Sequence, residues 1–364
     1  MYYNIEVWKK QLFFSENSKK VFPVLLCKNP PGGGQTKGSR RPPHGERPGI
    51  RAGPGGGGAH KLYKEGTHMR QRRTDLALEA KELWEESARQ TARLEGVAAF
   101  TETREGFLTE TVEILDERGE EALGKPVGRY VTLTMDGLAR REEDAFPRAA
   151  RAVGGELAQL MDGVPDRGLA LVVGLGNRAI TPDAIGPKVH EHTLVTRHLV
   201  EQIPEHFGAF RPVASLSAGV LGATGMESGE LVQAVCRRLK PACVVAVDAL
   251  ASRSLKRLCR TVQLSDTGIA PGSGVGNHRW ALDRASLGVP VLAVGVPTVV
   301  DASTLAADLL GQEELPPLGE GRDLLVTPKD IDSQVDDLAK VIGYGISLAL
   351  QPGLDVADLD LLLS

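Results

Sequence analysis

Residues 169–198 read LALVVGLGNRAITPDAIGPKVHEHTLVTRH, and this stretch indicates the fold. It opens with an apolar run, residues 169–173, followed by the turn sequence GLGN at 174–177. An apolar run without polar alternation is typical of a strand that is buried on both faces, as in a parallel sheet. Glycine in the turn lets another group approach the backbone closely. The stretch therefore predicts a central parallel strand that ends in a tight turn.

Two acidic residues each follow a predicted strand. Asp183 lies just past the first strand, and Asp248 follows a second apolar run at 241–247. If the two strands lie in one parallel sheet, both carboxylates reach the same edge, where open α/β sheets hold their chemistry. Two carboxylates in one site can share a proton, so that one acts as a base and the other as an acid. The alternative is that each acid only caps a helix or lies in a loop.

Helical and strand patterns alternate through the rest of residues 73–364. This alternation predicts a three-layer α/β sandwich with a mostly parallel central sheet, plus a small β-containing N-terminal subregion. The predicted strands are 97–100, 109–115, 130–135, 213–216, 243–247, 262–264, 291–294 and 324–326, and 117–119 is predicted as a turn. The predicted helices are 74–92, 142–161, 193–203, 228–239 and 328–350.

Charge divides the chain into a basic head and an acidic body. Residues 1–73 carry 15 Lys and Arg against 4 Asp and Glu, whereas the remaining residues carry 28 against 43. Within the head, residues 28–58 contain 11 Gly and 6 Pro, so this tract buries too little apolar surface to fold. We predict that residues 1–68 are a disordered extension and that Met69 is a candidate for the biological start. A nucleic-acid-binding role for the head is the weakest alternative, because no aromatic residues interleave its charges.

The cysteines and the hydropathy of the sequence indicate in which cellular compartment the protein works. The four cysteines show no CxxC and no histidine at zinc spacing, so we interpret them as reduced thiols. No apolar run approaches the roughly 20 residues of a membrane span, and no signal peptide is evident. We predict a cytoplasmic protein without a membrane partner.

Several familiar site motifs are absent or incomplete. The GLGN turn lacks the later acidic residue of a dinucleotide fingerprint, and the loop GSGVGN at 272–277 lacks the ending of a P-loop. The chain contains no HExxH and no GxSxG, and no cofactor is predicted. The glycine-rich segments favour a cleft in which an extended peptide lies close to the backbone. Its predicted lining residues are Gly174, Gly176, Asn177, Asp266, Gly272, Gly274 and Gly276.

A series of segments, in order, resembles the spore germination proteases, which are endopeptidases that degrade small acid-soluble spore proteins. The resemblance covers residues 73–364 almost throughout. Residues 1–68 have no counterpart, and the segment between Asp301 and Thr327 is shorter than in that family. The matching segments are RTDLALE (73–79), GRYVTL (128–133), 172–199 with GLGN, TPDAIGP and LVTRHL, SAGV (217–220), TGME (224–227), VDALASR (247–253), 265–277, GVPTVVD (295–301) and VTPK (326–329).

The resemblance implies a homotetrameric zymogen of the developing spore, with a fold similar to the hydrogenase-maturation endopeptidases. It also implies a catalytic pair of aspartates, Asp183 and Asp248. One aspartate, ionised, would take a proton from water as general base, and the other would donate a proton to the carbonyl oxygen or the leaving amine. The alternative is metal-assisted hydrolysis, in which both aspartates and a histidine hold one divalent ion.

The resemblance extends to the start of the acidic body. The family's substrates are cut after an acidic residue, within a motif of the type Thr-Glu, an apolar residue, Ala, any residue, Glu. Residues 74–79 (TDLALE) reproduce this pattern. We therefore predict self-processing between Asp75 and Leu76, in an exposed segment open to proteolysis, which divides the chain into a propeptide (69–75) and a catalytic domain (76–364). The alternative is that Thr74 merely caps a helix, with Asp75 in its first turn.

Overall fold

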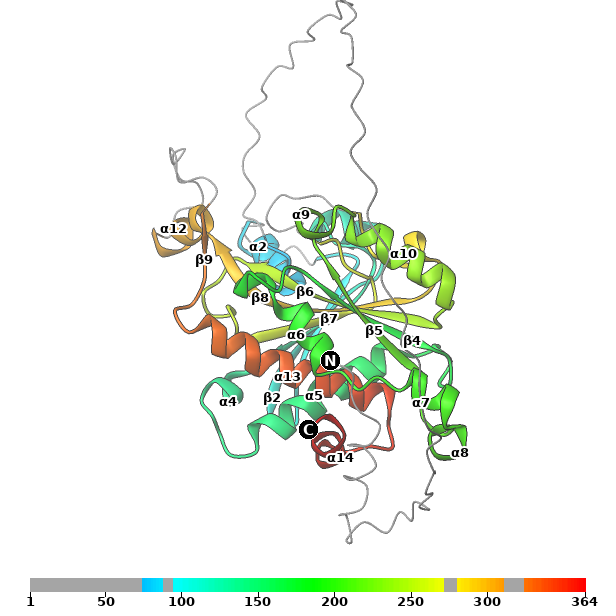
Figure 1. The fold of residues 1–364 in the computed structure, drawn as a ribbon. Coiled ribbons are helices and arrows are strands. Elements are labelled where there is room, and N and C mark those ends of the chain that lie inside the picture. Colours follow the sequence, from blue (N-terminus) through cyan, green and yellow to red (C-terminus); the bar gives the residue numbers. More distant parts are fainter. Residues whose placement is uncertain (1–73, 88–93, 272–279, 311–323) are drawn as a thin grey trace, which may run out of the picture. The chain divides into compact units, whose positions relative to one another are not determined.

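A computed structural model describes residues 74–87, 94–271, 280–310 and 324–364 (Figure 1). In this part of the chain, a nine-stranded sheet has the order β1-β2-β3-β7-β8-β6-β4-β5, and β9 pairs with β8. The predictions for residues 1–68, for Met69 and for Gly272, Gly274 and Gly276 fall outside the described residues. The strands are β1 Val97–Arg104, β2 Phe107–Ile114, β3 Gly128–Thr134, β4 Ala170–Leu175, β5 Val213–Gly219, β6 Cys243–Ser252, β7 Thr261–Ser265, β8 Val291–Asp301 and β9 Leu325–Val326.

The sheet is mixed rather than mostly parallel. Strands β8, β6, β4 and β5 are parallel, whereas β7 runs antiparallel to β8 and also pairs with β3. Through β7, the predicted N-terminal subregion β1–β3 is continuous with the main sheet. The reason lies in the connection from β6 to β7. Residues 253–260 contain no helix and are too few for the crossover that a parallel neighbour requires, so β7 returns in the opposite direction.

Helices cover both faces of the sheet, as predicted for a three-layer sandwich (Figure 1). Ala170 and Val172 of β4 pack in one core with α5 (Ala145–Leu160) and α13 (Ile331–Leu350). Leu171 and Val173 face the other way and pack with α10 (Ser228–Leu239). Successive residues of a strand point to opposite faces, so one apolar run contributes to two cores. This explains why the strand reads as apolar throughout.

The structure differs from the sequence prediction in three short segments. Residues 117–119 are not a turn but the start of helix α3 (Glu117–Leu123), because the side chain of Asp116 accepts hydrogen bonds from the backbone N–H groups of Arg118 and Gly119. Helix α6 (Ile185–Glu191) was not predicted at all, although it follows the TPD motif directly. The predicted helix 193–203 is shorter, as α7 (Arg197–Gln202).

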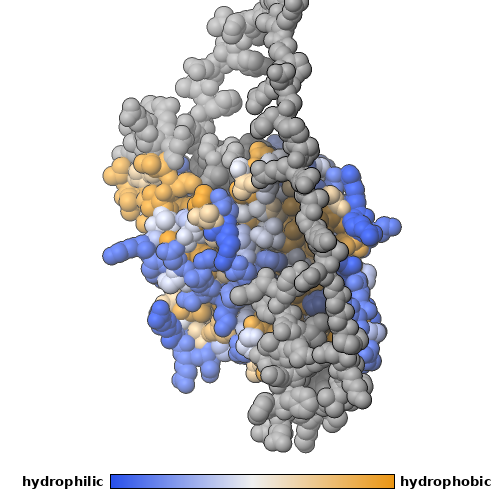
Figure 2. Space-filling model, viewed as in Figure 1, coloured by the Kyte–Doolittle hydropathy of each residue, from blue (hydrophilic) through white to orange (hydrophobic). Residues whose placement is uncertain are grey.

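The remaining helices are short or peripheral. Within the described residues, no helix is long and apolar enough to cross a membrane. Figure 2 shows apolar surface over α12, and the exposed apolar side chains of this region are Leu309, Leu310, Leu324 and Leu325. The other helices are α2 Ala77–Ser87, α4 Asp136–Ala139, α8 Pro204–Phe207, α9 Leu221–Thr224, α11 Arg284–Leu287, α12 Ala302–Leu310 and α14 Val356–Leu363, with the 3₁₀ turn η1 at Thr181–Asp183.

Candidate active site

Asp183 is held at the carboxyl end of β4 by the turn that follows the strand. It is the last residue of η1, and its Oδ2 accepts a hydrogen bond of 2.8 Å from the backbone N–H of Asn177. The carbonyl oxygen of Pro182 accepts a bond of 2.6 Å from the hydroxyl of Thr298 in β8. The hydroxyl of Thr181 donates to Asp332 at the start of α13. These two bonds fix the TPD motif to β8 and to α13.

Glycine permits this close packing at three positions. Gly176 has a φ of +105°, and a Cβ there would lie 2.1 Å from the carbonyl oxygen of Asp183. A Cβ on Gly174 would lie 2.2 Å from the carbonyl oxygen of Gly186. A Cβ on Gly186 would lie 2.3 Å from the carbonyl oxygen of Leu175 and 2.5 Å from that of Val247. The predicted glycines Gly174 and Gly176 thus position Asp183 and α6 against the strand ends.

Asp248 lies within β6 rather than after it. The strand was predicted to stop at this residue, but it continues to Ser252, because β8 runs alongside it and pairs Asp248 with Gly295 and Ser252 with Val300. Asp248 is only 5% exposed, whereas Asp183 is half-buried. One carboxyl oxygen of Asp248 accepts a bond from the backbone N–H of Ala249.

The fold brings the two aspartates to the same edge of the sheet. Strands β4 and β6 are adjacent and parallel, and Gly174 pairs with Val247, the residue before Asp248. The turn η1, which ends at Asp183, contacts β6 directly. A pair of carboxylates that differ in burial suits a division into acid and base, since burial disfavours the charged form.

Asp266 is not part of this arrangement. Strand β7 runs antiparallel to β8, so it leaves the sheet at the edge opposite the carboxyl ends of β4, β6 and β8. The carboxylate of Asp266 accepts a bond of 2.8 Å from the backbone N–H of Arg129 in β3. In a mostly parallel sheet the end of this strand would lie beside Asp183 and Asp248, but the antiparallel β7 holds Asp266 at the opposite end, away from the predicted cleft.

The histidines nearest to Asp183 in sequence lie in and after α6. The Nδ1 of His190 lies 2.6 Å from the hydroxyl oxygen of Ser215 in β5, so this histidine contacts a serine and not an aspartate through that nitrogen. Among the described residues, no three His, Cys, Asp or Glu side chains are grouped in a way that could hold a metal ion. Cys236, Cys243 and Cys259 are buried free thiols.

Two partly buried histidines, His190 and His192, predict an acid-sensitive fold. Burial lowers the pKa of both His190 and His192 below the usual 6.5. A lowered folded-state pKa means that the unfolded chain binds more protons in mild acid, so this stability is present above about pH 6.5 and is lost as the pH falls through the folded-state pKa. We expect His190→Gln to reduce the fall in melting temperature between pH 7 and pH 5. The exposed His198→Gln is the control, and an equal fall in all three proteins contradicts the assignment.

The predicted self-processing segment docks at the far end of β6. The backbone N–H of Asp75 donates to the carbonyl oxygen of Ala251 (3.1 Å), and the N–H of Ala251 donates to the carboxylate of Asp75 (2.8 Å). Leu76 is fully buried, so the segment is not exposed as predicted. Ala251 lies three residues beyond Asp248, about 10 Å along the strand. The sequence suggested the cut but gave no signal of this docking.

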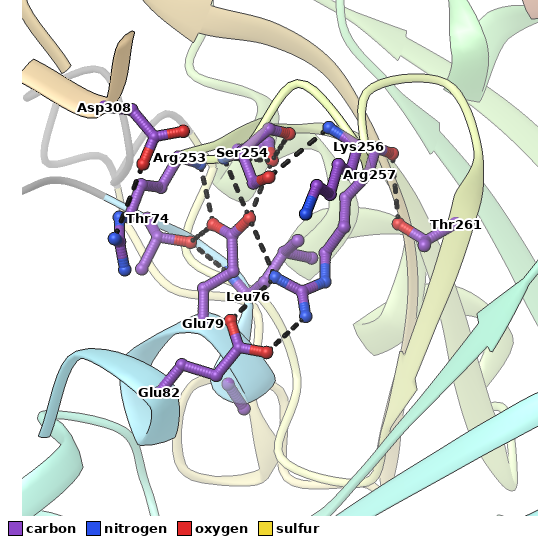
Figure 3. Close-up of polar contacts among 12 residues, drawn as sticks. Thr74, Leu76, Glu79, Glu82, Arg253, Ser254, Lys256, Arg257, Thr261 and Asp308 are labelled. Atoms are coloured by element: carbon purple, nitrogen blue, oxygen red, sulfur yellow. Dashed lines mark hydrogen bonds and ion pairs between the residues drawn. The ribbon is translucent and has the colours of Figure 1, made fainter. Parts of the chain in front are cut away.

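Glu79 fastens the same segment from inside the fold (Figure 3). It is fully buried and accepts bonds from side chains and backbone of the loop that follows β6. Thr74 is not the N-cap of α2, which begins at Ala77. Its hydroxyl oxygen instead accepts from the N–H of Leu76 (3.0 Å) and donates to Glu79 (2.6 Å). From the sequence, Glu79 was predicted only to be the last residue of the TDLALE motif.

The comparisons with known proteins agree with this picture. A family model described as germination protease matches residues 77–312. The chain belongs to the germination protease family. A germination protease of Caldanaerobacter subterraneus subsp. tengcongensis is 44% identical, over 80% of this chain and 98% of the relative. Relatives of the same name from Clostridium perfringens and Bacillus licheniformis are 40% and 37% identical, over 79% and 76% of this chain and 98% and 93% of the relatives.

Membership in the family gives the activity in outline. The protein is a protease associated with germination, and the resemblance inferred from the motifs is confirmed. Both Asp183 and Asp248 lie inside the matched residues 77–312, as do Gly174, Gly176 and Asn177. The proposed cut between Asp75 and Leu76 lies just before that range.

Proposed function

We propose that this protein is an endopeptidase that initiates the degradation of small acid-soluble spore proteins, with Asp183 and Asp248 as its catalytic pair. The observation that supports the pair is that Asp183, in the turn after β4, and Asp248, within the neighbouring parallel strand β6, lie beyond the last paired residues of β4 and β6, Gly174 and Val247, and that Asp248 is nearly buried. The experiment is incubation of the protein, after its N-terminus has been processed to Leu76, with an acid-soluble spore protein, followed by mass spectrometry of the fragments. Cleavage after acidic residues supports the proposal, and an intact substrate refutes it.

The chemistry follows from the difference in burial. In the proposed mechanism, the more exposed Asp183 is ionised and takes a proton from the attacking water, while the buried Asp248 holds the shared proton and donates it to the substrate. The two groups titrate as a pair, so the pH profile reports the pair and not one residue. Gly174 and Gly176 are buried against Gly186 and Asp183, so their part in this mechanism is to hold Asp183 beside the strand end.

We further propose that the protein works as a homotetramer in the spore core and is made as an inactive precursor. In this precursor, residues 69–75 are the propeptide, residues 76–364 are the catalytic domain, and residues 1–68 are a dispensable extension. Because Leu76 is buried and Asp75 pairs with Ala251, residues 74–76 must detach from β6 before an aspartate pair can reach the bond. The cut therefore follows a local opening or is made by a second copy.

Self-processing is testable at the level of the new terminus. Mild acid favours a half-protonated aspartate pair, so incubation at mildly acidic pH is expected to produce a new N-terminus at Leu76. N-terminal sequencing detects it, and the Asp183→Asn chain is the control that is expected to stay uncut. An intact chain with full activity towards spore proteins contradicts the precursor model.

A further inference from the structure

The carboxylate of Glu79 is the centre of a buried group of donors, which we call the Glu79 cluster: Glu79, Thr74, Ser252, Arg253, Ser254 and Arg257 (Figure 3). Oε1 accepts from the Ser252 hydroxyl (2.9 Å), the Ser254 N–H (3.0 Å) and the Arg257 guanidinium (3.4 Å). Oε2 accepts from the Arg253 N–H (2.7 Å) and the Thr74 hydroxyl (2.6 Å). Each oxygen is thus saturated in the intact chain.

The proposed cut divides this cluster unequally. All three donors to Oε1 lie C-terminal to the Asp75–Leu76 bond and stay with the mature chain. Of the two donors to Oε2, only the N–H of Arg253 stays, because Thr74 leaves with the propeptide. A buried carboxylate oxygen that loses a partner is costly unless another donor takes its place.

The replacement donor is already adjacent. The Thr74 hydroxyl oxygen lies 3.0 Å from the backbone nitrogen of Leu76 and 2.6 Å from Oε2 of Glu79. One hydroxyl oxygen therefore separates the future terminal nitrogen from the carboxylate. Hydrolysis adds the oxygen of water to the carbonyl carbon of Asp75 and breaks its bond to the nitrogen of Leu76. The two hydrogens of water pass to that nitrogen, which gives a carboxylate on Asp75 and an ammonium on Leu76.

We propose that processing creates an ion pair between the new Leu76 ammonium and Glu79, in the position that the Thr74 hydroxyl occupies before the cut. The inference rests on the proposed cleavage between Asp75 and Leu76. It makes Glu79 the acceptor of the mature N-terminus and joins that terminus to the loop after β6, the strand that carries Asp248.

The charges of the surroundings favour the pair. Arg257 is shared between Glu79 and Glu82, with distances of 2.6 and 2.9 Å to the Glu82 carboxylate, so two carboxylates share one guanidinium. One further positive charge balances this group, and it can come from the new ammonium or from Lys125, which already interacts with Glu79. An ammonium at the N-terminus of α2 is disfavoured by the helix dipole, but Glu79 in the first turn offsets it. The competing cation is Lys125, whose ammonium contacts the Thr74 carbonyl oxygen in the intact chain.

The experiment measures the reactivity of the Leu76 amine in the processed chain. A free α-amino group has a pKa of about 7.7–8.0, and a paired one stays protonated to higher pH. We expect reductive methylation of Leu76 at pH 8, followed by mass spectrometry, to be on the order of tenfold slower in the processed wild type than in processed Glu79→Gln. Glu82→Gln is the matched control, because Glu82 shares Arg257 but does not contact Thr74, and its labelling is expected to equal that of the wild type.

A second measurement needs no substitution. If the ion pair raises the pKa of the Leu76 amine, it stabilises the folded chain at pH values below the amine pKa of the unfolded chain. This stabilisation is lost as the pH rises through the amine pKa of the folded chain. Raising the pH from 7 to 10 is therefore expected to lower the melting temperature of the processed chain more than that of the uncut chain. The ion pair is overturned if the melting temperatures of the processed and uncut chains depend equally on pH and the Leu76 amine of the wild type is labelled fast. This is the result expected if Lys125 takes the place of Thr74 beside Glu79.

Failure of the cut itself is distinguished from failure of the ion pair. Where residues 71–75 are replaced by Asp-Asp-Asp-Asp-Lys in the full chain, enteropeptidase produces the same Leu76 terminus without self-processing. If the natural sequence is never cut but the enteropeptidase product shows slow labelling, the precursor model fails and the ion pair stands. If both routes give Leu76 and labelling is fast in both, the ion pair fails and the precursor model stands.

Discussion

Asp183→Asn and Asp248→Asn are each expected to abolish cleavage of spore proteins while leaving the fold intact. The amide keeps the shape of the side chain but cannot exchange the proton, and positioned acid–base groups contribute on the order of 10²–10⁴-fold each. The Asn177 N–H that now donates to Asp183 can donate equally to the amide oxygen of the variant. Activity assays against an acid-soluble spore protein, with circular dichroism of each variant, measure the effect.

Asp266→Asn is the matched control for this pair. The sequence suggested that Asp266 lines the cleft, but its carboxylate binds the N–H of Arg129 at the opposite edge of the sheet. The amide oxygen can accept the same bond, so activity is expected to change less than threefold. Substantial activity in either Asp183→Asn or Asp248→Asn would exclude the aspartate pair. A complete loss after treatment with a strong chelator would instead favour the metal-assisted alternative.

Gly186→Ala is expected to destabilise the protein and to lower its activity, although Gly186 bears no chemical group. A Cβ at this position would lie 2.3 Å from the Leu175 carbonyl oxygen and 2.5 Å from that of Val247. Both contacts are with strand backbone, which cannot move aside without disturbing Asp248. Overpacking of this kind costs about 1–3 kcal/mol or more, and urea unfolding measures it.

Gly155→Ala tests whether the effect is specific to the position. Gly155 lies on the exposed face of α5, and a Cβ there meets nothing within 4 Å. This change is expected to stabilise the protein by about 0.5–1 kcal/mol, because alanine loses less conformational freedom than glycine in a helix. If Gly186→Ala unfolds at the same urea concentration as the wild type, α6 does not depend on close contact with the strands.

The sequence predicted the central strands β4, β6 and β8 because each begins with an unbroken apolar run. The same pattern predicted that Asp183 and Asp248 follow neighbouring strands. The direction of β7 was not predictable in the same way, since an apolar run has the same pattern in both directions. Asp266, which follows β7, was placed in the cleft for that reason. The end of β6 was misjudged because Asp248 is polar, whereas the strand continues through it on hydrogen bonds to β8.

The docking of residues 74–76 on β6 could not be predicted from the sequence pattern either. Thr74 and Glu79 are five residues apart and suggest a helix start, which is what α2 provides nearby. The partners of Glu79, which are Ser252, Arg253 and Ser254, lie more than 170 residues further along the chain. Only the three-dimensional contact of α2 with the loop after β6 joins them. Long-range polar contacts of this kind leave no periodic signal in a single sequence.

The position of Ala251 and Asp248 on one strand has a thermodynamic consequence. Strand β6 pairs with β8 from Val244 to Ser252, with a register shift between Leu250 and Ala251, so the acid and the docking point of residues 74–76 lie on one strand. Coupling between two sites is reciprocal: each changes the equilibrium at the other by the same free energy. If detachment of the N-terminal segment strengthens peptide binding between the aspartates, then a bound peptide favours detachment to the same extent. Substrate would then act as an effector of the precursor's own maturation.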